Sequence, residues 1–507
     1  MDLDKIYTYM EKRRYDLAEK SLQELLDAGA EKEAQELLVS LYIECSEREK
    51  AEHALQALLH IAPREAYTLF LQARVHFMKG CSLSVVKELE LALKGKNMQS
   101  AVKEKIYNLL GQCCRYFGNS RKSTECYLQA AKTAESTEMA ALEYSNYLFN
   151  RHYLDEPENE QSLAVSQHYN DFFQRVPPFI HRRREYPGQK IRIGYLSPDL
   201  RNHVVLRFSF ALLKYYDHDS FEVYCYMRGA QDEMSAAVAK LVNQWRDLSA
   251  YSAGEAARCI YEDQIDILFD LSGHTRDGCL PILAYRPAPV QLSGIGYFAT
   301  TGLSAVDYFL GDRYLDRGTE ENESQIISSP AFSEKLVLLP HSHFCYTPLC
   351  KADVSAGAPC KKKGYISYGC FNNFTKVTDE LLVIWQQIIR SVPHSRLLLK
   401  AEIFHTQEGR QLVKKRLLQA GFDLQQVEMR GTSLDYLHEY NDIDIALDTY
   451  PYPGGGTTCD ALYMGVPVIS LKGDSHGRRF GYSILMNAGF GELAASDWQE
   501  YVDKAVK

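Results

Sequence analysis

The chain has 507 residues, of which 46% are hydrophobic and 24% charged, an ordinary balance for a globular protein with room for roughly three domains. Its net charge of −9 argues against nucleic acid as a partner, because nucleic-acid-binding proteins usually carry a basic face. The 13 cysteines include no Cys-x-x-Cys pair, which argues against a zinc site and suits a reducing compartment better than a disulfide framework.

The N-terminal segment, Met1 to Lys5, begins acidic and leads into an amphipathic pattern. No basic segment followed by an apolar one is present there, so no signal peptide is expected. No uncharged apolar run reaches about 18 residues, so no membrane span is expected. Together with the cysteine usage, these features predict a cytoplasmic protein.

Residues 1–138 are predicted to form an arm of paired helices, because apolar residues recur at spacings of three and four and strand signals are nearly absent. Small residues mark the second helix of each pair at Ala18, Ala51, Ser84 and Ser123, which lie 33, 33 and 39 residues apart. This is near the 34-residue period of tetratricopeptide repeats, whose small residues let helices pack closely. We expect a tetratricopeptide-like superhelix that binds a protein; an irregular helical bundle is the alternative.

Residues 139–188 are predicted to be a helical connector. The helical period continues to Val176 without the repeat register, and Asp155-Glu156-Pro157-Glu158 interrupts it as a turn. Arg182-Arg183-Arg184 and Pro187-Gly188 then mark a domain boundary, since such a segment is typical of an exposed linker.

Residues 189–346 are predicted to form a Rossmann-like lobe. Strand-like apolar runs lie at 190–197, 221–226, 265–270 and 290–293, with helical stretches between them. Such alternation predicts a parallel sheet with helical crossovers.

A polar linker is expected at 347–363, and residues 364–507 are predicted to form a second lobe of the same kind. Its strand-like runs lie at 364–370, 396–400, 427–429, 443–447 and 466–471. Two such lobes enclose a cleft at the carboxyl ends of their strands, where open α/β sheets bind ligands.

The sharpest motif is Gly454-Gly455-Gly456-Thr457-Thr458, which follows a strand ending at Leu447 and opens a helix. Backbone amides and hydroxyls at a helix N-terminus form an anion site that suits a diphosphate. The motif is neither a Walker loop nor a GxGxxG fingerprint, which argues against a P-loop enzyme or a dehydrogenase. The alternative is an ordinary capped helix after a tight turn.

A lysine follows the first strand of the second lobe, in Phe371-Asn372-Asn373-Phe374-Thr375-Lys376. From this edge Lys376 could reach into the cleft and neutralise a departing nucleoside diphosphate. A fixed cation there stabilises the transition state more than the ground state. The alternative is a solvent-exposed loop lysine.

Two histidines follow strands of the first lobe. His203 ends Ser197-Pro198-Asp199-Leu200-Arg201-Asn202-His203, and His274 lies four residues after Asp270. Facing the cleft, such side chains can hydrogen-bond sugar or acceptor hydroxyls, or accept a proton near neutral pH. The alternative for each is a structural histidine.

No metal site is expected. Asp442-Ile443-Asp444 spells a DxD string, but it lies at the start of an apolar strand, the end away from the cleft. We interpret both aspartates as structural.

From about Lys190 to the end of the chain, these segments resemble the O-GlcNAc transferase and SPINDLY family of nucleotide-sugar protein glycosyltransferases, and the repeat arm fits the same architecture. The resemblance is carried, in order, by 199–203, 286–291 with 296–297, 371–376, and 447–449 followed by 457–467.

The resemblance implies a GT-B fold and an inverting, metal-independent transfer of a sugar to Ser or Thr hydroxyls of a protein. The donor is a nucleotide sugar, with UDP-GlcNAc favoured, and no further cofactor is implied. His203 would lie against the reacting sugar and Lys376 would hold the diphosphate as the catalytic-site residues. The implied donor-binding residues are Asn373, Tyr436, Gly456, Thr457, Thr458 and Asp460.

The sequence departs from the family pattern in several places. Tyr436 stands where the animal family stacks a histidine on uracil, which leaves uridine and guanosine donors open, and Arg207 stands where a second histidine is common. The inter-lobe linker is short, as in bacterial members, and the chain ends at Lys507, where relatives continue with helices. The alternatives are a catalytically weak or inactive repeat scaffold that binds a protein partner, and a GDP-fucose-dependent or glycan-directed transferase.

Overall fold

The computed structural model describes residues 3–12, 14–29, 31–95, 98–181, 190–316 and 323–507. The chain divides into two compact units, Met1–Tyr147 and Leu148–Lys507. The predicted connector is therefore shared between the units. Its expected boundary at Arg182-Arg183-Arg184 and Pro187-Gly188 lies outside the described residues.

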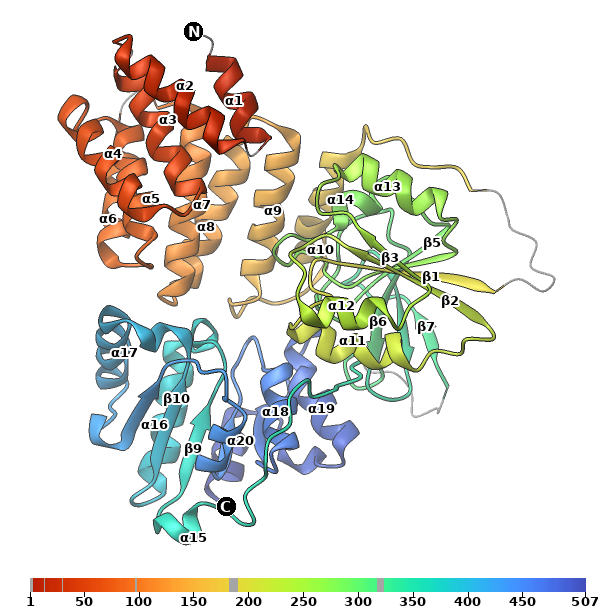
Figure 1. Cartoon of the computed structure of the whole chain (residues 1–507). Coiled ribbons are helices and arrows are strands. Elements are labelled where there is room, and N and C mark those ends of the chain that lie inside the picture. Colours follow the sequence, from red (N-terminus) through yellow and green to blue (C-terminus); the bar gives the residue numbers. More distant parts are fainter. Residues whose placement is uncertain (1–2, 13, 30, 96–97, 182–189, 317–322) are drawn as a thin grey trace. The chain divides into compact units, whose positions relative to one another are not determined.

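The first unit consists of consecutive helices that pack as neighbours, α1 with α2, α3 with α4, α5 with α6 and α7 with α8 (Figure 1). Their bounds are α1 Leu3–Glu11, α2 Tyr15–Asp27, α3 Glu31–Glu44, α4 Arg48–Ile61, α5 Ala66–Phe77, α6 Leu83–Ala92, α7 Ser100–Tyr116 and α8 Ser120–Thr133; α9, Thr137–Arg151, crosses into the second unit. The apolar faces share one core that extends from Ile6 to Cys126. This confirms the predicted tetratricopeptide-like arm of paired helices.

The small-residue register holds at three of its four positions. Ala18, Ala51 and Ser123 are fully buried, whereas Ser84 is exposed and Val85 takes the buried position in α6. The reason is local, because the Ser82 side chain caps α6 by accepting from the Val85 amide, which leaves Ser84 in the outer first turn. The buried positions are then 33, 34 and 38 residues apart.

Close helix packing is clearest between α7 and α8. A Cβ on Gly111 would lie 3.2 Å from the ring of Tyr127, so a larger side chain at this position would push the helices apart. The hydroxyl of Ser123 donates to the Gly111 carbonyl oxygen at 2.8 Å. Small residues therefore set the spacing of this pair.

The second unit begins with the end of α9, followed by α10 (Glu160–Gln167) and the 3₁₀ helix η1 (His168–Phe173). The turn predicted at Asp155-Glu156-Pro157-Glu158 separates α9 from α10, and Asn159 caps α10. Among the described residues, no helix combines the length and apolar character needed to cross a membrane. The described residues include all 13 cysteines, and none of these forms a disulfide.

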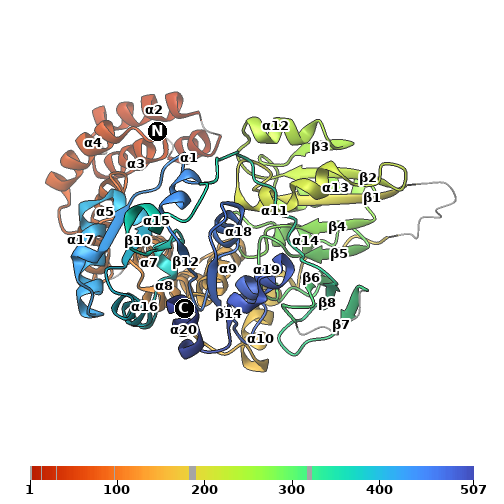
Figure 2. The same ribbon diagram turned by 90° about the horizontal axis from the view of Figure 1, so that it is seen from below.

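In the described residues the first lobe contains an eight-stranded sheet in the order β3-β2-β1-β4-β5-β6-β8-β7, in which only the β7–β8 pair is antiparallel. Figure 2 shows the strands in this order from top to bottom. The strands are β1 Ile191–Ser197, β2 Phe221–Met227, β3 Gln244–Asp247, β4 Ile267–Asp270, β5 Val290–Ser293, β6 Tyr308–Asp312, β7 Gln325–Ile327 and β8 Lys335–Leu339. The helices are α11 Val204–Lys214, α12 Glu233–Ala239, α13 Ala253–Glu262 and α14 Leu280–Leu283.

The second lobe contains a parallel sheet in the order β11-β10-β9-β12-β13-β14. The strands are β9 Ser367–Cys370, β10 Arg396–Lys400, β11 Val427–Arg430, β12 Ile445–Leu447, β13 Val468–Leu471 and β14 Ala494–Ala495. The helices are α15 Cys360–Lys363, α16 Asp379–Ser391, α17 Gln407–Gln419, α18 Gly456–Tyr463, α19 Phe480–Ala488 and α20 Trp498–Val506, with 3₁₀ turns η2 Phe374–Lys376, η3 Glu402–His405, η4 Leu424–Gln426, η5 His438–Asp442, η6 Gly477–Arg479 and η7 Gly491–Leu493. Both lobes are the predicted Rossmann-like folds.

One buried hydroxyl, that of Tyr501, holds the helix α20 against the rest of the second lobe. The Tyr501 hydroxyl donates to the Asp448 carbonyl oxygen at 2.9 Å and accepts from the Trp385 indole of α16 at 3.3 Å. Since Asp448 directly follows β12, this contact joins α20 to the strand end that leads into the glycine turn.

Candidate functional site

The candidate residues stand on loops at the carboxyl ends of three strands. β1 leads to His203 and α11, β9 leads to Lys376, and β12 leads to the glycine turn and α18. The first of these loops belongs to the first lobe and the other two to the second. Their placement is the one predicted for a ligand site between open parallel sheets.

Two helix N-termini, one from each lobe, lie side by side. A Cβ on Gly456, the first residue of α18, would lie 2.7 Å from a side-chain carbon of Val204, the first residue of α11. A Cβ on Gly455 would lie 3.8 Å from the ring of Phe208. Because helix N-termini carry partial positive charge and free amides, the two together suit an anion.

A buried carboxylate holds the glycine turn in shape. One oxygen of Asp448 accepts from the amides of Thr449 at 2.8 Å and Gly454 at 2.7 Å, and the other accepts from the Ser470 hydroxyl at 2.7 Å. The side chain is buried, and this burial raises the pKa of Asp448. Asp448 directly follows a predicted strand, but its sequence position did not indicate this positioning role.

Both threonines after the glycines hold the turn from within. The Thr457 hydroxyl donates to Asn372 Oδ1 at 2.8 Å, which joins the start of α18 to the loop after β9. The Thr458 hydroxyl is buried and donates to the Gly454 carbonyl oxygen at 2.9 Å. Thr457 remains partly accessible, whereas Thr458 acts here as an internal brace of the helix start.

Lys376 points at the glycine turn. Its ammonium donates to the carbonyl oxygen of Pro453 at 3.0 Å and lies 3.7 Å from the centroid of the Tyr452 ring. Burial lowers the pKa of Lys376 to about 8, and the nearby Asp448 carboxylate opposes this effect. Asn373 shapes the turn beneath it, since its side-chain oxygen accepts from the amide and hydroxyl of Thr375.

His203 caps α11 and keeps part of its ring accessible. Its Nδ1 accepts from the Val205 amide at 3.4 Å and lies 3.6 Å from Asp199 Oδ2. Burial lowers the pKa of His203, the Asp199 carboxylate opposes this, and the Arg201 charge adds to it. The imidazole is therefore neutral near pH 7 and able to hydrogen-bond a ligand.

A cluster of four side chains joins the two lobes, about one helical turn after the starts of α11 and α18. Arg207 of α11 lies 3.1 Å from Asp460 Oδ2 of α18 and also donates to the hydroxyl of Tyr436. The hydroxyls of Tyr436 and Tyr346 both donate to Asp460, the former at 3.0 Å. Tyr346 was missed in the sequence, and Arg207 was noted there only as a departure from the family.

Asp270 and His274 are buried within the first lobe, whereas the sequence analysis expected both side chains at the accessible edge of the cleft. Asp270 is fully buried, and its two oxygens accept from Ser272, Gly273 and Ser293. His274 is 1% exposed, its Nε2 lies 2.9 Å from the Thr301 carbonyl oxygen, and burial lowers its pKa to about 3. Both side chains therefore hold the loop after β4 in place.

The DxD aspartates are engaged in structural contacts. Asp444 accepts from the amides of Cys360 at 2.9 Å and Ser367 at 2.8 Å, and Asp442 pairs with Arg430 at 2.6 Å. Asp444 lies at the start of β12, as expected from the sequence, whereas Asp442 reaches Arg430, the last residue of β11.

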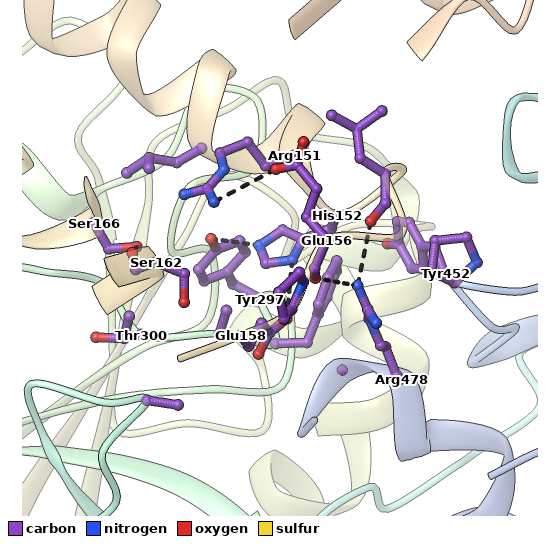
Figure 3. Close-up of a pocket in the computed structure, with 18 residues that line it drawn as sticks. Arg151, His152, Glu156, Glu158, Ser162, Ser166, Tyr297, Thr300, Tyr452 and Arg478 are labelled. Carbon is purple, nitrogen blue, oxygen red and sulfur yellow. Dashed lines mark hydrogen bonds and ion pairs between the residues drawn. The ribbon is translucent and has the colours of Figure 1, made fainter. Parts of the chain in front are cut away.

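A cavity of about 50 Å³ lies where residues 148–166 meet both lobes (Figure 3). In its wall, His152 Nε2 lies 2.9 Å from the Tyr297 hydroxyl, and Arg478 donates to Asp155 at 2.8 Å. Tyr452 also lines it, so one aromatic ring borders both this cavity and Lys376. The sequence analysis assigned none of these residues a functional role, although Tyr297 lies in a segment that carries the family resemblance.

Two successive Rossmann-like lobes, with one helix start from each lobe side by side, are the arrangement of the GT-B fold of glycosyltransferases. The sequence matches the model of glycosyl transferase family 41 over residues 170–347 and 361–507, and the chain belongs to this family. The unmatched stretch between the two segments lies within the predicted linker.

The named proteins that this chain is similar to include probable peptide N-acetylglucosaminyltransferases. The probable UDP-N-acetylglucosamine–peptide N-acetylglucosaminyltransferase SPINDLY of Solanum lycopersicum is 33% identical over 71% of this chain and 39% of that protein. The protein of the same name from Arabidopsis thaliana is 34% identical over 71% of this chain and 40% of that protein. The chain thus spans about two-fifths of the length of these relatives.

A solved structure is similar over nearly the whole chain. A lysine-to-methionine mutant of the Thermobaculum terrenum O-GlcNAc transferase matches with a TM-score of 0.80 and 27% identity. The match covers 94% of this chain and 89% of that one. The likeness therefore includes the helical unit as well as the two lobes.

Proposed function

We propose that this chain is a protein O-glycosyltransferase that moves a sugar, with GlcNAc favoured, from a nucleoside diphosphate donor to Ser or Thr hydroxyls. The observation that carries the proposal is the position of Lys376, which contacts the glycine turn where two helix N-termini meet. The family membership and the names of the relatives support the same reaction class.

In this proposal the leaving group determines the arrangement of the site. Negative charge grows on the diphosphate as the bond to the sugar breaks, and a fixed ammonium and helix amides stabilise that charge. Lys376, Gly456 and Thr457 would bind the diphosphate, so the transfer would be metal-independent. Inversion at the sugar carbon follows if the acceptor hydroxyl attacks the face opposite the diphosphate.

The remaining residues would position the donor and the acceptor. Asp460 and Tyr436 would hold the ribose and the base, and the neutral His203 would hydrogen-bond the reacting sugar. Asn373 would act through the turn that carries Lys376. A protein acceptor bound by the arm and a cytoplasmic location remain predictions from the sequence.

The test uses the purified full chain with UDP-GlcNAc and GDP-fucose, measuring donor hydrolysis and labelling of protein acceptors. Lys376→Met is compared with wild type and with Lys363→Met, whose lysine pairs with Asp442 at the start of the strands. We expect the first variant to lose transfer and the second to retain it. Equal rates in wild type and Lys376→Met would refute the role of Lys376, and no binding of any nucleoside diphosphate would favour a protein-binding scaffold.

A further inference from the structure

Arg207 and Asp460 face each other at matching depth on the two helices that meet at the site. Val204 lies beside Gly456 at the two helix starts, and one turn further along each helix Arg207 lies beside Asp460. Steps of three residues along α11 and four along α18 each correspond to about one helical turn, so the ion pair lies directly behind the proposed anion site. The pair thus closes the space into which a bound nucleotide would extend.

Asp460 already has all the donors it needs in the free protein. Its side chain is 4% exposed and accepts from Arg207 and from the hydroxyls of Tyr346 and Tyr436. Arg207, in contrast, has spare capacity, because its buried Nε has no hydrogen-bond partner among the described residues. An unpaired buried donor on a guanidinium costs free energy, which an incoming acceptor would recover.

We propose that Arg207 changes partners when the donor binds: ribose hydroxyls of a nucleoside diphosphate replace it on Asp460, and the guanidinium turns to the diphosphate. This inference rests on the proposed function and adds a residue to it. Arg207 then binds the leaving group from the first lobe while Lys376 binds it from the second.

The charges of Arg207 and Asp460 determine which ligand can separate the two side chains. Separating a buried Arg–Asp pair leaves two uncompensated charges, so the ligand must supply donors to the carboxylate and acceptors to the guanidinium together. A nucleoside offers only the hydroxyls, and pyrophosphate offers only the anion. A nucleoside diphosphate offers both, and its paired phosphate oxygens suit bidentate binding by arginine.

The experiment measures binding by calorimetry to the full chain, with UDP and GDP compared with uridine, guanosine and pyrophosphate. Arg207→Gln removes the charge and keeps most of the length of the side chain. The matched control is Arg246→Gln, which removes an Arg–Asp pair of 2.7 Å on the outer strand β3 of the same lobe. Circular dichroism and thermal unfolding of each variant report whether it is folded. If Arg207→Gln is not folded, Arg207→Lys replaces it in the binding experiment.

We expect Arg207→Gln to bind the preferred nucleoside diphosphate about tenfold or more weakly, and the matching nucleoside no more weakly than wild type. The Arg246→Gln control should bind both as wild type does. If Arg207 is only structural, Arg207→Gln will bind the nucleoside and the nucleoside diphosphate more weakly to the same extent. If Arg207 only blocks the site, the variant will bind the nucleoside diphosphate more tightly than wild type. Either result would overturn the inference. If wild type binds neither UDP nor GDP, the proposed function itself fails.

Discussion

The ammonium of Lys376 donates to the carbonyl oxygen of Pro453 at 3.0 Å, so the cation and the glycine turn share one site. The two come from loops after different strands, β9 and β12, which are neighbours in the sheet. Their contact makes the proposed diphosphate site a property of the folded lobe rather than of either motif alone.

Replacing Lys376 with methionine should slow transfer strongly and raise stability. The kcat of Lys376→Met should fall on the order of 10²–10³-fold, because a fixed charge on the leaving group is lost. The free protein should become more stable at pH 7 by about 1–3 kcal/mol, since methionine removes the cost of holding a charge in a buried place. Steady-state kinetics and urea unfolding check the two parts. A variant that lost both activity and stability would show that Lys376 is structural.

The same lysine predicts how activity and stability change with pH. Burial lowers the pKa of Lys376 to about 8 from 10.5, so the free enzyme loses the ammonium above about pH 8 and kcat/KM should fall there. The folded state releases the proton before the unfolded state does, so stability should rise with pH between 8 and 10.5. Unfolding measured across this window should show the rise in wild type and not in Lys376→Met. An identical pH dependence in the two proteins would contradict the lowered pKa.

Asp448 should matter for the shape of the turn. Asp448→Asn replaces one acceptor oxygen with a donor, and the amides of Thr449 and Gly454 or the Ser470 hydroxyl then lose their partner. We expect a loss of about 1–3 kcal/mol in the free energy of unfolding, together with weaker donor binding. Chemical unfolding and calorimetry measure these effects. Asp442→Asn, at the opposite end of the strands, is the control for donor binding, which it should leave unchanged.

Much of the fold was predictable because its signals are local. The strands β1, β2, β4 and β5 begin or end within a few residues of the predicted runs, since buried parallel strands are short apolar segments. The strand β3, Gln-Trp-Arg-Asp at the edge of the sheet, has no such run and was missed. In the arm, Ser84 was expected to be the small residue that marks the second helix, but α6 is capped by Ser82 and buries Val85 instead.

The site was predictable only in part. Lys376 and Gly456 were found because glycines after a strand and a lysine at a strand end are visible in a short window. The contact of Arg207 with Asp460 joins residues 253 positions apart and depends on how the two lobes meet, which no local pattern encodes. For Asp270 and His274, the local pattern reveals the strand end but not whether the side chain turns inward.

Arg478 should anchor the segment that precedes the first lobe. Its guanidinium is buried and donates to Asp155 at 2.8 Å and to the carbonyl oxygens of Leu154 and Glu156. Arg478→Met should cost about 2–4 kcal/mol, because these acceptors are left without their donor. Thermal and urea unfolding measure the loss. Arg258→Met, at an exposed position on α13, is the control and should change stability little.

Gly456 should be required where the two helix starts meet. An alanine there would place its Cβ 2.7 Å from a side-chain carbon of Val204, so the helices or the side chain must move apart. We expect Gly456→Ala to weaken donor binding by about 1–3 kcal/mol through this overpacking. Shortening the partner in Gly456→Ala/Val204→Ala should restore most of the affinity, because the clash is removed while the helix amides remain. Calorimetry with the preferred nucleoside diphosphate measures all three variants, with Val204→Ala alone as the reference. If the double variant binds no better than Gly456→Ala, the glycine is needed for backbone approach of the ligand and not for the meeting of the lobes.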